Sequence, residues 1–236
     1  MATIANKTQS QDTSMAQTSS AGAIPECKEF LLNHFQQRSD WDCGLSCILM
    51  ILPRNHREHF LRDFERICAE NGFGRSTWTI DLCFILRQFN ISFRFLTRTI
   101  GVNPDYRGHS YYDKIISKDE ERVNKKFEIA IKDGMDIEKR TISIDALIQH
   151  MALNGPVIIL TNAALLYCDM CKKDPFFRSK RYSGHYVVLC GYDLNKRKIK
   201  YRNPAKENHI CVASYELMDK ARMAYGTDED IILIYL

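Results

Sequence analysis

The chain has 236 residues, and its 33 Lys and Arg residues against 29 Asp and Glu residues leave a formal net charge of only +4. This balance argues against a protein built mainly to bind nucleic acid, which concentrates more positive charge. No apolar run approaches the ~18 residues of a membrane span, and residues 1–17 lack an apolar stretch of signal-peptide length. We therefore expect a soluble protein of the cytoplasm, with the nucleus as a second compartment, that binds neither nucleic acid nor membrane.

The N-terminal segment differs in composition from the rest of the chain. Residues 1–24 are rich in Ser, Thr, Gln and Ala, carry few charges and have no apolar periodicity. Such a composition cannot offset the entropy of ordering. We predict a disordered tail over 1–24 and a single domain over 25–236.

Several helices are predicted in chain order. The apolar run 43–52 predicts a buried helix that ends before Pro53. Apolar side chains at helical spacing predict further helices over 57–70, over a segment capped by Thr77 and containing 80–86, between Ser143 and Gly155, and over 214–224. The charged segment 118–126, together with Tyr111 and Tyr112, predicts an exposed helix with Glu–Lys pairs.

Strands dominate the C-terminal third. Segments 91–96 and 156–161 predict two strands, and 184–192 with 198–202 predict a hairpin around a polar turn. Residues 230–236 form an apolar run, as expected for a strand that is covered on both faces. Helices first and antiparallel strands later predict the α+β class.

The nine cysteines indicate small buried hydrophobes in a reducing compartment more than a disulfide framework. Cys168 and Cys171 form a CxxC pair, which is half of a zinc site, but no second CxxC follows. His185 or His209 could add ligands only through folding. On this pattern we predict neither a metal nor a cofactor.

The segment from Gln37 to Gly44 carries the sharpest chemical signal. Cys43 stands at the start of the first predicted helix, where the helix dipole favours a thiolate. Gln37 lies six residues earlier, so its amide and the Cys43 N–H could stabilise an oxyanion. The alternative is that Cys43 is an ordinary buried cysteine.

A nucleophilic thiol needs a base, and the predicted hairpin offers one. His185 begins its first strand, and Asn203 falls near Val187 across the ladder. The Asn203 side-chain carbonyl could therefore orient the His185 imidazole, although an Asn-Pro pair also marks an ordinary turn and a single His is often structural. The order of Gln, Cys-Gly, His and Asn is that of papain-like cysteine hydrolases.

These residues also carry a family resemblance. The segment QQRSDWDCGLSCILMIL looks like the active-site segment of the bacteriocin-processing peptidases, which are papain-like. More of the chain resembles the guanylyl cyclase domain-containing protein family, in WDCGLSC, STWTIDL, GHYVVLCGYD, NPA and AYGTDEDIILIYL. The resemblance implies a papain-like fold, N-terminal helices packed on a C-terminal antiparallel sheet, with Cys43, His185 and Asn203 as a triad and Gln37 at the oxyanion position.

The family name also implies conversion of GTP to cyclic GMP, which we keep as an alternative. The sequence has no GxxxxGK[ST] phosphate loop. The acidic run 228–230 is predicted as a solvated turn more than a metal site, and Arg75, Arg178 and Arg181 have no framing motif. Trp78 and Asp81 either line the cleft or serve as a core anchor and a first-turn helix acid.

We therefore predict a thiol-dependent hydrolase or acyltransferase acting on an amide or isopeptide bond of a protein or peptide. Guanylyl cyclase is the second hypothesis, and a catalytically silent binding module on the same fold is the third. The sequence determines neither the substrate nor the oligomeric state.

Overall fold

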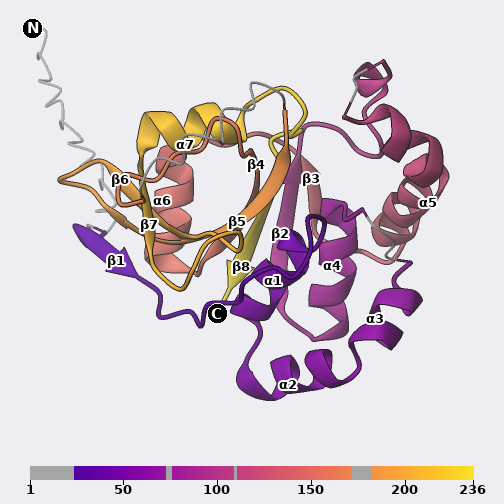
Figure 1. Ribbon diagram of the computed structural model, residues 1–236, viewed down its shortest axis with the longest axis horizontal. Helices are drawn as coiled ribbons and strands as arrows, with labels where there is room; N and C mark the ends of the chain where they lie inside the picture. The colour runs from indigo at the N-terminus through magenta and orange to yellow at the C-terminus, as the bar shows by residue number, and fades with distance from the viewer. Residues whose placement is uncertain (1–23, 73–75, 109–110, 172–181) are drawn as a thin grey trace, which may run out of the picture.

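The computed structural model describes residues 24–72, 76–108, 111–171 and 182–236, and in these ranges one sheet is flanked by helices on both faces (Figure 1). The tail predicted over 1–24 lies outside the described residues except for Ile24, which packs against the core. None of the helices in these ranges combines the length and apolar character that a membrane span requires.

The sheet contains eight strands in the described part of the chain, ordered β3-β2-β8-β4-β5-β6-β7, with β1 paired to β5. Their bounds are β1 Cys27–Glu29, β2 Ser92–Thr97, β3 Ile137–Lys139, β4 Val157–Asn162, β5 Gly184–Asp193, β6 Lys198–Arg202, β7 Cys211–Ser214 and β8 Ile231–Tyr235. The pairing of β2 with β3 is parallel and the other described pairings are antiparallel. The predicted hairpin is therefore confirmed as β5 and β6.

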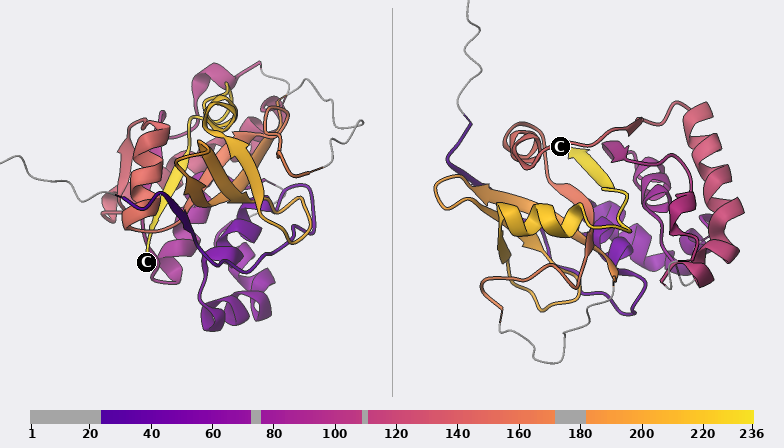
Figure 2. Two further views of the ribbon diagram at one scale, coloured as in Figure 1. Left: turned by 90° about the vertical axis from the view of Figure 1, so that its left-hand side faces the viewer. Right: turned by 90° about the horizontal axis from the view of Figure 1, so that it is seen from above.

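Helices cover the two faces of this sheet unequally. Their bounds are α1 Cys43–Ile51, α2 Arg54–Arg62, α3 Phe64–Glu70, α4 Thr79–Gln88, α5 Asp113–Lys132, α6 Ile144–Leu153 and α7 Tyr215–Arg222, with a short 3₁₀ turn at Pro104–Tyr106. The first five lie together to one side of the sheet and α6 and α7 lie on the other (Figures 1 and 2). The predicted α+β class is confirmed.

Helices cover both faces of the sheet, and successive residues of a strand point to opposite faces. Neighbouring residues of one strand therefore enter two different cores. In β4, Ile158 and Leu160 join the core under α1 and α4, whereas Val157 and Ile159 join the core under α6 and α7. This two-sided burial explains why the segment reads as a continuous apolar run. The last strand, β8, lies between β2 and β4, so its predicted place inside the sheet is also confirmed.

Some local predictions need correction. The helix predicted over 57–70 is two helices that meet at Asp63, whose carboxylate binds the Arg66 side chain at 2.7 Å and whose backbone leaves the helical region. The following helix begins at Thr79 and is not capped by Thr77, because the Asp81 carboxylate accepts the Trp78 N–H at 2.9 Å. The short strands β1, β3 and β7 were not predicted, because three or four residues carry too little periodicity.

One glycine makes the pairing of β1 possible. A Cβ on Gly191 would lie 2.2 Å from the Lys28 carbonyl oxygen. The second half of β5 can therefore accept β1 only with glycine at this position. This pairing ties the start of the domain to the strand that also carries His185.

Candidate active site

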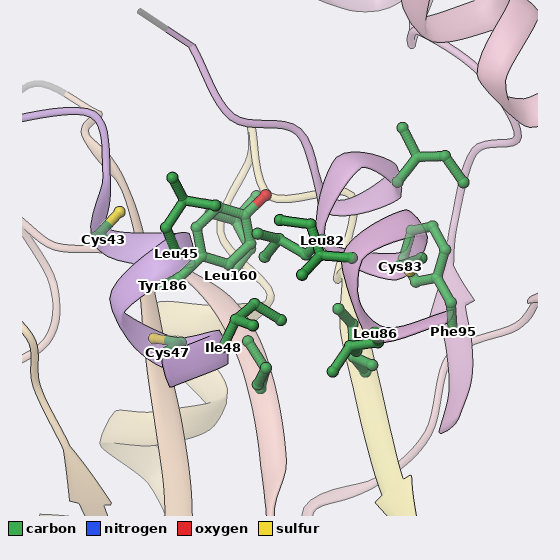
Figure 3. Packing of buried hydrophobic residues seen from close by; sticks show 14 of the residues in the cluster. Cys43, Leu45, Cys47, Ile48, Leu82, Cys83, Leu86, Phe95, Leu160 and Tyr186 are labelled. Carbon is green, nitrogen blue, oxygen red and sulfur yellow. The ribbon is translucent and has the colours of Figure 1, made fainter. Parts of the chain in front are cut away.

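Cys43 is held at the first position of α1 by its own preceding loop. The Asp42 carboxylate accepts the backbone N–H groups of Arg38 at 3.1 Å and Ser39 at 3.0 Å, which closes residues 38–42 into a tight turn. Figure 3 shows Cys43 at the start of α1 with its sulfur pointing beyond the first turn, while Leu45 packs toward Tyr186. The thiol therefore lies at the N-terminal end of the helix, where it is 5% exposed and belongs to the edge of the apolar cluster under α1.

Close packing fixes that helix on β5. A Cβ on Gly44 would lie 3.0 Å from the Leu82 side chain and 3.1 Å from the Tyr186 ring. The glycine thus lets the first turn of α1 approach α4 and β5 closely. As a consequence, Cys43 reaches the residues at the start of β5.

The predicted contact between His185 and Asn203 is present. The β5–β6 register places Arg202 opposite Val188, and His185 Nε2 lies 2.8 Å from Asn203 Oδ1. The same Oδ1 accepts the Ala205 N–H at 2.9 Å, which identifies it as the oxygen. His185 must then donate through Nε2–H, so in the neutral ring Nδ1 is the basic nitrogen.

The thiol lies beside the backbone of the same strand. The N–H of Tyr186, the residue after His185, is among the groups that lower the pKa of Cys43. Within the described residues, no hydrogen bond joins the Cys43 thiol to the His185 ring. The two side chains thus come from neighbouring positions, and their direct convergence stays a prediction.

The electrostatics of this pair differ from the predicted thiolate. Burial raises the pKa of Cys43 to about 11, and the Asp42 charge adds to this, although the Tyr186 and Gly44 N–H groups act in the opposite direction. Burial also lowers the pKa of His185, against the effect of its bond to Asn203. The thiol and the imidazole are therefore both neutral near pH 7. Desolvation at the start of α1 outweighs the favourable helix dipole.

Gln37 lies near the Asn203 turn. Its backbone N–H donates to the Pro204 carbonyl at 2.9 Å, which joins the loop before α1 to the loop after β6. Its side-chain amide donates to the Ser39 carbonyl at 2.6 Å, and among the described residues its buried Oε1 has no hydrogen-bond partner. The predicted oxyanion role of Gln37 stays a prediction, since this amide is directed to Ser39.

A pocket of about 360 Å³ opens next to Cys43. Aromatic and hydroxyl side chains form much of its wall, and the described residues that line it include Trp41, Cys43, Trp78, Thr79, Tyr111, Tyr112, Phe127, Leu160, Tyr186, Thr227, Asp228 and Asp230. Tyr111 and Tyr112 were predicted on an exposed helix, but they precede α5 and face this pocket. The sequence missed them because aromatic pairs carry no signal for which side they face.

The acidic run at 228–230 is not the solvated turn that was predicted. Glu229 is buried, and both Asp228 and Asp230 line the pocket. Burial, and then the charge of Asp228, raises the pKa of Asp230 to about 8. Its carboxyl accepts a hydrogen bond from Thr79, whose hydroxyl also meets the Tyr186 hydroxyl at 2.8 Å. These groups join the turn before β8 to the start of α4.

Trp78 and Asp81, both from the STWTIDL segment, have different surroundings in the structure. Trp78 lines the pocket, whereas Asp81 is fully buried below it. Asp81 pairs with Arg122 and Lys126 of α5, each at 2.6 Å. The helix predicted over 118–126 thus spans Asp113–Lys132 and is anchored to α4 by a buried ion pair, not merely exposed.

A second cluster lies away from Cys43, on the other side of the β5–β6 hairpin. The ligand atoms of Cys168, Cys171, His209 and Cys211 all lie within 4.8 Å of one another. The sequence offered Cys168 and Cys171 as half of a metal site, and folding adds the HxC pair at 209–211. A search for a second CxxC misses it because the partner motif contains a histidine.

Comparisons with known proteins place the chain in a family. The family model described as "Guanylylate cyclase" matches residues 32–234. The chain belongs to this family. It is 33% identical over 223 residues to "Guanylyl cyclase 1" of Arabidopsis thaliana, covering 90% of this chain and 78% of that protein.

One solved structure also aligns with most of the chain. The crystal structure of a putative C39-like peptidase from Bacillus anthracis aligns with a TM-score of 0.47 and 17% sequence identity, covering 89% of this chain and 97% of that one. The predicted membership of the guanylyl cyclase domain family is confirmed by the family match and the plant relative.

Proposed function

We propose that this protein is a thiol-dependent hydrolase or acyltransferase that acts on an amide or isopeptide bond. The observation that carries the proposal is the fixed His185–Asn203 pair at the start of β5, which leaves Nδ1 as a base beside the helix that begins at Cys43. A base oriented by a third group next to a nucleophile is the arrangement that covalent acyl transfer requires.

The chemistry follows from the protonation states. Because thiol and imidazole are both neutral, Cys43 Sγ attacks the substrate carbonyl carbon while its proton moves to His185 Nδ1. The imidazolium then returns that proton to the leaving amine as the C–N bond breaks, and a thioester with Cys43 remains. Water, or an acceptor amine, then attacks the thioester carbonyl carbon while its proton moves to His185 Nδ1; the C–S bond breaks, the acid or new amide leaves, and the imidazolium returns the proton to Cys43 Sγ. In this scheme the Cys43 N–H and a reoriented Gln37 amide stabilise the oxyanion.

The pocket favours a substrate with a positive charge. The Asp, Glu, His, Lys and Arg side chains among those described in its lining are Asp40, Asp228 and Asp230, all carboxylic acids. With a pKa of about 8 the Asp230 carboxyl is mostly neutral near pH 7, and a cation bound beside it would favour its ionised form. A Lys or Arg side chain, or a peptide amino terminus, would complement these groups, and Trp41 and Trp78 would contact its apolar part. We therefore propose a basic peptide or protein segment as substrate.

A peptidyl electrophile tests this function. The full chain is incubated with a Lys-containing peptidyl vinyl sulfone, and labelled cysteines are mapped by mass spectrometry. We expect saturable labelling of Cys43 that His185→Gln slows by about 100-fold or more, because general base catalysis contributes roughly 10²–10⁴. Cys47→Ala is the matched control, since Cys47 lies one turn further along α1 and should leave the rate unchanged. Labelling of Cys43 that is indifferent to His185→Gln would exclude the triad.

Guanylyl cyclase activity is the second candidate, because the family description and the plant relative carry that name. A triphosphate would meet Asp228 and Asp230 in this pocket, and Arg75, Arg178 and Arg181 lie outside the described residues. We expect no cyclic GMP by mass spectrometry when the chain is incubated with GTP and Mg²⁺ or Mn²⁺. Product formation that survives Cys43→Ala would instead favour the cyclase.

The free state of the cysteines supports a protein that resides in a reducing compartment. None of the nine cysteines, all of which lie in the described ranges, forms a disulfide. We accordingly propose the cytoplasm, with the nucleus as a second location.

A further inference from the structure

Outside the Cys43 pocket, two distant segments of the chain bring four metal-ligating side chains together, namely Cys168, Cys171, His209 and Cys211. Cys168 and Cys171 lie in the connection between β4 and β5, whereas Cys211 begins the edge strand β7. The Asp169 N–H donates to the Val212 carbonyl at 2.8 Å, which holds the two segments against each other. Two motifs about 40 residues apart thus present four soft or borderline ligands to one point.

The distances between these ligands suit a tetrahedral metal. Zn–S bonds of about 2.3 Å and Zn–N bonds of about 2.1 Å give tetrahedral edges of about 3.8 Å between two sulfurs and about 3.6 Å between sulfur and nitrogen. Cys171 Sγ lies 3.8 Å from Cys211 Sγ, and His209 Nε2 lies 3.4 Å from Cys211 Sγ and 3.0 Å from Cys171 Sγ. A bound ion would open the edge between Cys171 Sγ and His209 Nε2 by about 0.6 Å. Cys168 Sγ lies within 4.8 Å of the other three ligand atoms, so only small shifts complete the tetrahedron.

Backbone groups already surround one of the sulfurs. Cys168 Sγ accepts the N–H groups of Met170 and Val212, both at 3.3 Å. Hydrogen bonds of this kind stabilise a thiolate and orient it toward a metal. They come from both segments, so they favour the same arrangement as the metal would.

We propose that Cys168, Cys171, His209 and Cys211 bind one structural Zn²⁺. Three cysteines and one histidine fill all four positions of a tetrahedral site, so the ion has no open position for substrate. Three thiolate ligands select zinc over the hard cations Mg²⁺ and Ca²⁺. Binding releases the thiol protons to solvent and leaves the histidine neutral.

The position of the site gives the metal a structural consequence. The ion joins the connection before β5 to β7, and it fixes the loop 203–210 at its far end. That loop begins with Asn203, the partner of His185. The metal is therefore expected to order one wall of the hairpin that carries the imidazole. This assignment goes beyond the proposed hydrolase function and does not depend on it.

Metal content of the full chain is the first measurement. The protein is expressed in zinc-supplemented medium, purified without chelators and analysed by plasma mass spectrometry. We expect about one zinc per chain, and a loss of most of it in Cys171→Ser. Cys27→Ser is the matched control, because Cys27 is exposed on β1, outside the cluster, and should keep the full zinc content.

A second measurement keeps the test decisive if Cys171→Ser fails to fold. The unmodified chain is stripped with a chelator and titrated with Co²⁺, which should give sulfur-to-metal charge-transfer and tetrahedral ligand-field bands at one equivalent, displaced by Zn²⁺. Removal of the metal should lower the Tm by about 5 °C or more, reversed by Zn²⁺. Substoichiometric zinc without a tetrahedral Co²⁺ spectrum, or equal zinc in Cys171→Ser and Cys27→Ser, would overturn the proposal.

Discussion

The reactivity of Cys43 toward a small alkylating agent should be low near neutral pH. With a pKa of about 11, about 0.03% of the thiol is ionised at pH 7.5, against about 9% for a free cysteine whose pKa is about 8.5. The thiolate fraction of Cys43 is therefore about 300-fold lower than that of a free cysteine. The greater nucleophilicity of a more basic thiolate recovers about 10-fold, so iodoacetamide should modify Cys43 about 20 to 30 times more slowly than a free thiol.

The assay follows each cysteine separately. Iodoacetamide rates are measured from pH 5.5 to 10.5 by peptide mapping, with exposed Cys27 as the internal reference for reagent access. The Cys43 rate should rise tenfold per pH unit without a plateau below pH 10. His185→Gln should change it by less than about twofold, because a neutral imidazole does not stabilise a thiolate.

A different profile would refute this reasoning. A plateau between about pH 5 and 8 that disappears in His185→Gln would mean that thiolate and imidazolium form a stable pair in the free protein. Burial would then not dominate at the start of α1, and the Cys43 thiol would have a pKa well below the value that the packing gives. The hydrolase proposal is tested separately by the peptidyl electrophile, since a bound substrate can use His185 as a base without a preformed ion pair.

Three further predictions concern stability. The folded pKa of Asp230 is raised to about 8, so the native state binds an extra proton between about pH 4 and 8 and stability falls as pH rises through this window. Asp230→Asn should therefore increase the Tm more at pH 8 than at pH 5, and its gain in the free energy of unfolding at pH 8 has an upper limit of about 5 kcal/mol. An equal change at both pH values would contradict the burial argument. Deleting 231–236 removes four buried side chains of β8, each of which contributes roughly 1.5–3 kcal/mol to a typical free energy of unfolding of about 5–15 kcal/mol. The shortened chain should therefore lose its cooperative melting. Deletion of 1–23 should shift the Tm by only a few degrees. Asp81→Ala should lower the free energy of unfolding by about 3–5 kcal/mol in urea titrations, because it leaves two cations of α5 without their buried partner. The control Arg54→Ala breaks an exposed pair and should leave the free energy of unfolding almost unchanged. Similar losses of stability in the two variants would contradict a stabilising role for the buried pair.

The sequence determined those features that depend on neighbours along the chain. The helix over 43–52, the β5–β6 hairpin and the apolar strand at the C-terminus follow from periodicity and turn residues, which act over a few positions. The contact between His185 and Asn203 was also predictable, because a short hairpin turn fixes which residues face each other. Cys43 at the start of α1 needed only the position of the first apolar turn.

Tertiary structure decided the properties that depend on distant segments. The pKa of Cys43 and that of Asp230 are set by burial under side chains far away in the sequence, so a helix-start cysteine became a neutral thiol and a polar turn became part of a pocket. His209 and Cys211 meet Cys168 and Cys171 only because β7 lies beside the connection before β5. Desolvation and ligand geometry are functions of three-dimensional neighbours, and no local pattern in the sequence specifies them.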